Sequence, residues 1–296
     1  MKKFGITGVA GYVAPRHLKA IKDTGNILIA AADPHDSVGI LDHYFPDAAF
    51  FTEIERFDRH LDKLRRSGEG IDYLSICSPN NLHDAHIRLA LRNNAHAICE
   101  KPLVLNPWNL DLLEKLEEEY NKNIFTVLQL RVHPSIIRLK ETIENNKSKN
   151  KFKVDLTYIT SRGRWYEYSW KGDIQKSGGI ATNIGIHFFD LLIWLFGKVT
   201  HQEVTLNDKN KIGGELELDF ADVNWFLSLD KDDLPVDVIK NGRTTFRSIK
   251  INGEEIEFSD GFTDLHTEVY RRTLSGNGFT IVDARPSIEL VYRLRK

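Results

Sequence analysis

Residues 3–14 read Lys-Phe-Gly-Ile-Thr-Gly-Val-Ala-Gly-Tyr-Val-Ala, a short apolar run that stops at Gly8 and opens a loop of small residues. Apolar side chains then recur at helical spacing at Tyr12, Leu18 and Ile21. A strand, a glycine loop and a helix in this order are typical of a dinucleotide-binding unit, where glycine lets backbone amides approach a pyrophosphate. The alternative is a plain glycine turn, because the full G-x-G-x-x-G pattern is not present.

Four further apolar runs continue this alternation, at residues 27–32, 71–76, 95–99 and 124–128. Helical patterns at about 82–92 and 107–120 separate the later runs. Continuously apolar strands between helices indicate a parallel sheet that is covered on both faces. We therefore predict an α/β protein with an N-terminal Rossmann dinucleotide-binding domain.

After about residue 150 the pattern changes to alternating polar and apolar residues, at 152–160, 216–220 and 223–229. Helical patterns lie at about 180–196, 263–275 and 284–294. This predicts a C-terminal α+β domain with an open, largely antiparallel sheet and helices on one side. We predict an oligomer surface on the other side, because a half-covered sheet with Phe, Trp and Val needs a partner.

Length and composition limit the alternatives. A chain of 296 residues predicts about two domains. We assign 1–130 to cofactor binding and 131–296 to substrate binding and oligomerisation, with the boundary between 125 and 150, where the Lys- and Asn-rich stretch 145–151 lies. The formal net charge of −2 argues against a nucleic-acid partner, which needs a basic surface.

Two cysteines, Cys77 and Cys99, provide no disulfide framework and favour a reducing cytoplasm. The N-terminus has no signal-peptide pattern. The most apolar later stretch, Ile184 to Phe196, is too short to span a bilayer and contains two polar residues. We therefore expect no membrane association and a buried helix at that stretch.

The cofactor candidates lie where predicted strands end. The first loop offers Gly8, Ala10, Gly11, Tyr12 and Val13, and the second strand ends at Asp33. A carboxylate there can accept hydrogen bonds from ribose hydroxyls and would repel a 2′-phosphate, so NAD is favoured over NADP. Alternatively, Asp33 only forms a turn before Pro34.

Ser78, Pro79 and Asn80 end the third strand and are candidates for the nicotinamide side. His83 and His86 lie three apart on the next helix, but no third metal ligand is evident, so we predict solvated histidines and no metal. We still count His83, together with Glu100 and Gln129, in the cofactor set.

Lys101, in Glu100-Lys101-Pro102 at the end of the fourth strand, is a candidate proton-transfer residue or a surface lysine. Asn183 and His187 lie four apart on an apolar helix, so one face carries both. Histidine suits a general base, but a satisfied core histidine is the alternative. Asp190 could orient the imidazole or serve the helix structurally.

A basic and aromatic segment precedes this helix, and its cations suit a diphosphate or a carboxylate. The alternative for its aromatic residues is a subunit interface. We assign Ser161, Arg162, Lys171, Asn183 and His187 to substrate binding, with Arg131 and Lys101. The roles of the aromatic residues stay open: Trp165, Tyr166 and Trp170.

The order of these motifs resembles the Gfo/Idh/MocA family of NAD(P)-dependent sugar oxidoreductases over nearly the whole chain. The C-terminal residues Phe262, His266, Tyr270, Leu274 and Gly276, followed by residues 283–285, fit the same pattern. Residues 8–17, 160–166, 169–173 and 261–266 look like the WlbA/WbpB group, UDP-N-acetyl-D-glucosaminuronate 3-dehydrogenases of bacterial surface-polysaccharide synthesis.

This resemblance implies NAD as cofactor and oxidation of the sugar C3 hydroxyl, with Lys101 and His187 as the catalytic pair. It also implies a role in lipopolysaccharide O-antigen synthesis, a homotetramer, and 2-oxoglutarate as a reoxidant that Arg131 would suit. Many family members carry Asp where this chain has Asn183. The Asn leaves no carboxylate for a His–Asp relay, and it fits an anionic substrate because it donates hydrogen bonds without adding negative charge. Two alternatives are another sugar or inositol dehydrogenase of this family and a non-catalytic NAD-binding regulatory protein.

Overall fold

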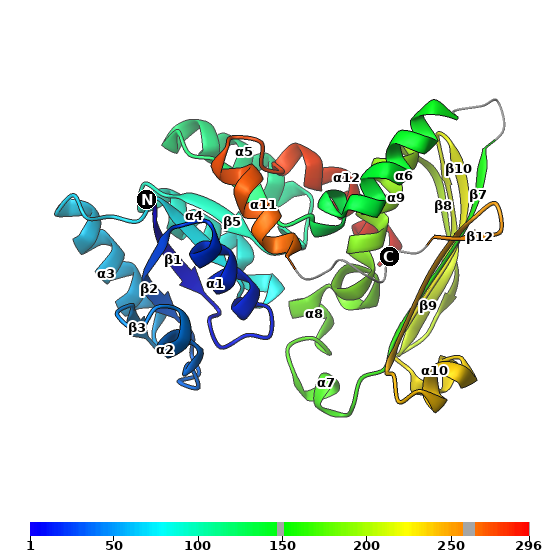
Figure 1. Ribbon diagram of the computed structural model, residues 1–296, viewed down its shortest axis with the longest axis horizontal. Coiled ribbons are helices and arrows are strands. Elements are labelled where there is room, and N and C mark those ends of the chain that lie inside the picture. The colour runs from blue at the N-terminus through cyan, green and yellow to red at the C-terminus, as the bar shows by residue number, and fades with distance from the viewer. Residues whose placement is uncertain (147–150, 257–263, 296) are drawn as a thin grey trace. The chain divides into compact units, whose positions relative to one another are not determined.

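The computed structural model describes residues 1–146, 151–256 and 264–295, and it divides into two compact units (Figure 1). Unit 1 comprises Met1–Gln129 and Thr263–Arg285, and unit 2 comprises Leu130–Phe262 and Pro286–Lys296. We had placed every residue after 130 in the second domain, whereas Thr263–Arg285 belongs to unit 1. Helical periodicity shows that a segment has a buried face but not which sheet it covers.

Parts of two predicted features lie outside the described residues. They are residues 147–150 of the expected boundary stretch and residues 261–263, including Phe262, of the C-terminal motif.

Unit 1 contains a six-stranded sheet in which every neighbouring pair is parallel, as predicted. The strand order is β3-β2-β1-β4-β5-β6, the doubly wound order. The strands are β1 (Lys3–Thr7), β2 (Ile27–Ala32), β3 (Ala49–Phe51), β4 (Tyr73–Ile76), β5 (His96–Cys99) and β6 (Ile124–Thr126). The three-residue edge strand β3 was not predicted, because so short a run carries no period.

The helices of unit 1 pack on the apolar strands. They are α1 (Ala14–Asp23), α2 (Ile40–Tyr44), α3 (Ile54–Arg66), α4 (His83–Arg92), which the short turn η1 (Asn80–Leu82) precedes, α5 (Trp108–Tyr120) and α11 (Leu265–Leu274). Although α11 lies far along the chain, it packs against α1 (Figure 1). The last helix, α12 (Ile281–Leu294), continues from unit 1 into unit 2.

Unit 2 contains a second six-stranded sheet with the order β12-β11-β7-β10-β9-β8. Its pairs are antiparallel except β7 with β10, so the sheet is largely antiparallel, as predicted. The strands are β7 (Phe152–Thr160), β8 (Val199–Asn207), β9 (Lys211–Leu218), β10 (Ala221–Ser228), β11 (Thr245–Ile251) and β12 (Glu254–Glu255). The helical segments are η2 (Gln129–Val132), α6 (Pro134–Asn145), α7 (Trp165–Tyr168), α8 (Ile174–Ser177), the π-helical turn η3 (Ala181–Gly185), α9 (Ile186–Phe196), η4 (Lys231–Asp233) and α10 (Val236–Lys240).

The inner face of this sheet is the core of unit 2. Val223 and Trp225 of β10 are buried there, and the Trp225 ring meets Phe189 of α9 edge-on at 5.2 Å. The helix that supplies Phe189 belongs to a 23-residue stretch, Ile174–Phe196, that is apolar and long enough to cross a membrane. Its most apolar part is 72% buried, so it has the burial of a core helix, as we predicted for Ile184 to Phe196.

The outer face differs from our expectation. The Trp and Val side chains from which we argued an oligomer surface point inward, and Phe226 and Phe246 pack against a buried cluster at one end of the sheet, formed by Ile159, Leu234 and Val238. Exposed charged and polar residues such as Asp155, Glu215 and Asn224 occupy other parts of this face. The exposed part of the outer face is therefore polar, and it does not provide the apolar surface from which we argued an oligomer interface.

Gly185 lets the π-helical turn approach β10. A Cβ at this position would lie 2.5 Å from Leu227 Cδ1 and 2.8 Å from Phe189 Cε2. We expect Gly185→Ala to lower the free energy of unfolding by about 1–3 kcal/mol, because overpacking forces a rigid core to shift. Urea unfolding measures this. Gly39→Ala, with nothing within 4 Å of the added carbon, is the control, and equal losses in both variants would refute the close packing.

Candidate active site

Gly8 brings the first loop against the end of β4. Its φ is +78°, and an added Cβ would lie 2.5 Å from the carbonyl carbon and oxygen of Cys77. Its amide donates to Ala32 O at 2.8 Å, which fixes the loop to the end of β2. The loop therefore lies at the topological switch point between β1 and β4, where open α/β sheets bind their ligands.

Asp33 closes the same loop from the side. Its Oδ2 accepts from the Ala10 amide at 3.0 Å, and its Oδ1 accepts from the His35 amide at 2.9 Å. The second bond is the turn that we gave as the alternative role, and the first holds the glycine loop. Each carboxylate oxygen has two lone pairs, so both keep capacity for a ribose hydroxyl.

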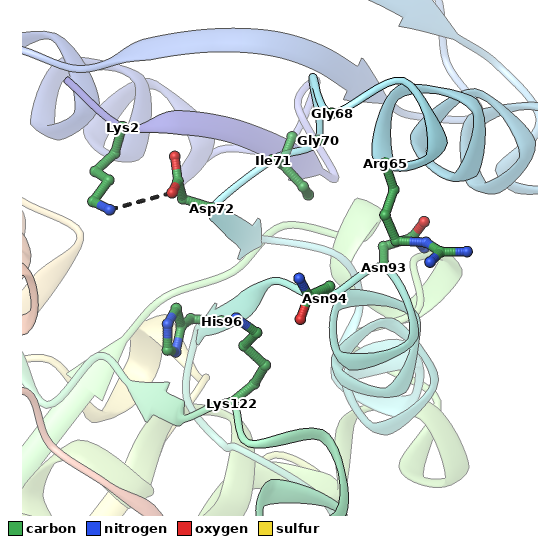
Figure 2. Close-up of a pocket in the computed structure, with 10 residues that line it drawn as sticks. All are labelled: Lys2, Arg65, Gly68, Gly70, Ile71, Asp72, Asn93, Asn94, His96 and Lys122. Carbon is green, nitrogen blue, oxygen red and sulfur yellow. Dashed lines mark hydrogen bonds and ion pairs between the residues drawn. The ribbon is translucent and has the colours of Figure 1, made fainter.

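A hollow of about 370 Å³ lies at the opposite end of the sheet, where the strands begin (Figure 2). It is formed where β1, β4 and β5 begin, and an ion pair of 3.2 Å between Lys2 and Asp72 crosses it. The Gly8 loop follows the carboxyl end of β1. This hollow is therefore separate from the predicted cofactor end of the sheet.

His83 and His86 are buried, with 1% and 9% of their surfaces exposed, so the prediction of solvated helix histidines was wrong. The His83 ring lies between two backbone carbonyls, with Nδ1 2.7 Å from Pro102 O and Nε2 2.8 Å from Ser78 O. His86 Nδ1 lies 2.9 Å from Ser78 Oγ. Burial lowers the pKa of His83, so the ring is neutral and its one N–H donates to one of the two carbonyls. Both rings thus lie against the ends of β4 and β5.

Glu100 is buried, and its carboxylate accepts from two imidazoles. Glu100 Oε1 lies 2.9 Å from His17 Nε2 and 3.0 Å from His266 Nε2. Burial opposes ionisation, but the hydrogen bonds from His17 and His266 hold the pKa of Glu100 well below its usual value. We predicted Glu100 as a cofactor residue, whereas these bonds are internal to unit 1. Sequence reasoning missed His17, whose burial no local pattern indicated.

Arg131 and Asp190 form a buried bidentate pair in unit 2. Arg131 Nε donates to Asp190 Oδ2 at 3.0 Å, and Nη2 donates to Oδ1 at 2.7 Å. The side chains are 7% and 4% exposed. Asp190 is therefore a buried counter-ion of Arg131, a partner that the sequence did not indicate.

Asn183 and His187 lie one turn apart on the core helix of unit 2. Asn183 is 9% exposed, and its Nδ2 donates to the Tyr166 hydroxyl at 2.8 Å. Tyr166 is buried, and desolvation raises its pKa although the bond with Asn183 opposes this. His187 is half-buried. Tyr166, whose role we left open, therefore orients the amide next to the candidate base.

Lys171 is a half-buried cation between aromatic rings. Its Nζ lies 5.4 Å from the Trp165 ring centroid and 5.7 Å from that of Trp170, which gives these rings a role as cation–π partners. Burial and the nearby Arg162 charge both lower the pKa of Lys171. Within the described ranges, no carboxylate forms an ion pair or hydrogen bond with it. This positive site therefore suits an anion.

Two family models match the chain, one described as an oxidoreductase family NAD-binding Rossmann fold over residues 2–128 and the other as the family's C-terminal alpha/beta domain over residues 140–290. The chain belongs to the Gfo/Idh/MocA oxidoreductase family. Among curated relatives, it is 27% identical over 202 residues to glucose-6-phosphate 3-dehydrogenase of Bacillus subtilis. The match covers 66% of this chain and 54% of that enzyme, so the chain spans about half the length of this relative.

Among solved structures, the chain is similar to the WlbA (WbpB) dehydrogenase of Thermus thermophilus. A complex of that protein with NAD and alpha-ketoglutarate is 54% identical, with a TM-score of 0.96, and the match covers 100% of this chain and 95% of that one. A complex of the same protein with NAD and UDP-GlcNAcA is 53% identical with the same TM-score and coverage.

Burial of neutral histidine makes the stability of the protein depend on pH. Desolvation and the neighbouring His83 lower the pKa of His86 to about 4, while the unfolded chain binds a proton near 6.5. Stability from this group is therefore lost as the pH falls from about 6.5 towards 4, by about 2 kcal/mol between pH 7 and 5.

Urea unfolding at pH 7 and pH 5 tests this expectation. The His86→Gln variant should lose about 2 kcal/mol less than the wild type over this interval. His201→Gln, at an exposed position on β8, is the control and should behave like the wild type. Equal pH dependence of all three proteins would contradict the assignment.

Proposed function

We propose that the protein is an NAD-dependent dehydrogenase that oxidises the C3 hydroxyl of UDP-N-acetyl-D-glucosaminuronic acid to the 3-keto sugar. The observation that carries this proposal is the 53% identity, over the full chain, to a dehydrogenase solved with NAD and UDP-GlcNAcA. Two features of this chain are consistent with it: the loop after Gly8 in unit 1 and the cationic side chain of Lys171 in unit 2.

The cofactor end of unit 1 fits NAD. A side chain at Gly8 would clash with the Cys77 backbone, so glycine lets the small-residue loop after β1 lie at the end of the sheet where a pyrophosphate binds. Asp33 holds the loop through Ala10 and keeps lone pairs for ribose hydroxyls, and its negative charge disfavours a 2′-phosphate. Ser78, Pro79, Asn80 and Gln129 stay in the predicted cofactor set.

The substrate requires positive charge, since it carries a diphosphate and a uronate carboxylate. Lys171, with Arg162 nearby and no carboxylate partner among the described residues, is the cation we assign to it. Binding an anion there relieves the repulsion between these two side chains. Asn183 adds hydrogen bonds without adding negative charge, as an anionic sugar demands.

The chemistry needs an acceptor for the hydroxyl proton. NAD, held at the Gly8 loop and Asp33, would supply the hydride acceptor for the sugar C3. Lys101 of unit 1 or His187 of unit 2 accepts the hydroxyl proton, so a carbonyl forms and two hydrogen atoms leave. A second substrate, 2-oxoglutarate, would take the hydride and a proton and become 2-hydroxyglutarate, which would return the cofactor to its oxidised form.

We place this activity in the cytoplasm, in synthesis of lipopolysaccharide O-antigen sugars, and assign a homotetramer by family resemblance. Two buried, unpaired cysteines are consistent with a reducing compartment.

Mass spectrometry of UDP-N-acetylglucosaminuronic acid after incubation with protein, NAD and 2-oxoglutarate tests the proposal. A product lighter by two hydrogens, with one 2-hydroxyglutarate formed per sugar, is expected.

Lys101→Ala and His187→Asn should each be assayed, because substitution of the proton acceptor should lower kcat by about 100-fold or more. A folded, NAD-binding protein that leaves this sugar unchanged but oxidises free sugars or inositol would overturn the substrate assignment, and one that oxidises nothing would favour a regulatory protein.

The assignment of Lys171 has its own test. We expect Lys171→Met to raise the KM for the nucleotide sugar by about 10- to 100-fold, since a charge-assisted contact is lost, and to change kcat little. Initial rates across substrate concentration measure this. Lys176→Met, in the same segment but exposed and 3.7 Å from Asp173, is the control and should keep the wild-type KM. An unchanged KM in Lys171→Met would remove Lys171 from the substrate site.

A further inference from the structure

The buried carboxylate before Lys101 ends a chain of hydrogen bonds between buried side chains. Glu100 Oε1 is an acceptor, so His17 and His266 each donate through Nε2. His17 Nδ1 is then an acceptor for the Tyr270 hydroxyl at 2.7 Å. Tyr270 in turn accepts from Ser75 Oγ at 2.6 Å. One consistent set of donors and acceptors thus runs from β4 through α11 and α1 to the residue before Lys101.

These groups are all withdrawn from water. Tyr270 and His17 are 0% exposed, His266 is 5% exposed and Glu100 is 8% exposed. A buried carboxylate is stable only when donors replace its hydration. The two imidazole N–H groups do this at one oxygen, and they come from helices at opposite ends of the chain.

The carboxylate also contacts the backbone of Lys101 directly. Glu100 Oε2 accepts from the Lys101 amide at 3.3 Å. On the other side of Lys101, the Pro102 carbonyl lies 2.7 Å from His83 Nδ1. Both peptide neighbours of Lys101 are therefore held by buried histidines, directly at Pro102 and through Glu100 on the other side.

Two histidines and a glutamate are also a ligand set for a divalent cation. A metal would need the Nε2 lone pairs of His17 and His266, whereas in a hydrogen-bonded trio both Nε2 atoms donate to Glu100 Oε1. The inference below concerns the hydrogen-bonded form.

We propose that His17 and His266 are positioning residues that act on Lys101 through Glu100, and that α11 returns to unit 1 to supply this support. The proposal rests on the proposed function insofar as it concerns turnover, because Lys101 is there a candidate proton acceptor. It goes beyond that function in giving a role to the hydrogen bonds that Glu100, His17 and His266 make with one another.

The ionised state of Glu100 gives the proposal a pH signature. The titratable groups around the carboxylate, from every element packed against it, are Arg16 and His17 of α1, Cys77 after β4, His83 of α4, Cys99 of β5, Lys101, and His266 and Tyr270 of α11. Removal of one imidazole donor raises the pKa of Glu100, because fewer hydrogen bonds then offset the effect of burial, which disfavours the ionised carboxylate. Turnover should then fall on the acid side, at a pH where the wild type is unaffected.

Three α11 variants separate positioning from simple loosening. His266→Phe keeps a ring beside His17, whose centroid is 5.0 Å away, but removes the donor. We expect it to lower kcat by about 10- to 100-fold and to add an acidic limb to the pH profile. His266→Gln restores an N–H donor and should recover most of kcat and remove the new limb. Val269→Ala, fully buried on the same helix, should lower the melting temperature while leaving the pH profile unchanged.

Two nuclear magnetic resonance measurements make the result independent of turnover. The signal of the Glu100 side-chain carboxyl carbon is assigned by its loss in Glu100→Gln. Its chemical shift should stay at the value of a carboxylate from pH 5 to 8 in the wild type and should change with pH in His266→Phe. The Lys101 backbone amide should shift in His266→Phe but not in Val269→Ala. If both signals behave this way while no nucleotide sugar is oxidised, the proposed function fails and the positioning role stands. If His266→Phe leaves both signals and the pH profile as in the wild type, the positioning role is refuted.

Discussion

Unit 1 is organised around a carboxylate that has lost its water. Glu100 cannot be buried as an anion unless donors replace its hydration, and one of these donors is the amide of Lys101. Two others, His17 and His266, come from α1 and α11, far apart along the chain. The return of Thr263–Arg285 to this unit therefore supplies a hydrogen-bond donor to Glu100 as well as packing.

The same turn depends on a second constraint, which is the close approach of two loops. The order β3-β2-β1-β4-β5-β6 places the ends of β1, β4 and β5 side by side. Gly8 removes a side chain where the first loop meets Cys77, and His83 joins the carbonyls of Ser78 and Pro102. Cofactor loop and Lys101 turn are thus parts of one rigid edge, so a change in either loop affects the other through backbone contacts.

The sequence predicted those features that depend on local period. The parallel sheet of unit 1 followed from continuous apolar runs, and the core helix through Asn183 and His187 from its unbroken apolar character. Pairings over long distances were beyond it. Nothing near His83 or His86 indicates burial, because their partners are backbone carbonyls and a serine hydroxyl. Nothing near Arg131 indicates that Asp190, 59 residues later, neutralises it.

The cations of unit 2 show how the fold separates structural charge from charge kept for a ligand. The sequence favoured Arg162 and Lys171 for an anionic substrate and added Arg131 as a further candidate. Folding pairs Arg131 with a buried carboxylate, whereas Lys171 is half-buried beside Arg162 and its pKa is lowered. A charge held at such a cost to the isolated protein is typical of a binding site, because an anion that enters it relieves both the desolvation and the repulsion. The pairing of Arg131 thus leaves Lys171 as the stronger candidate for recognising the substrate's negative groups.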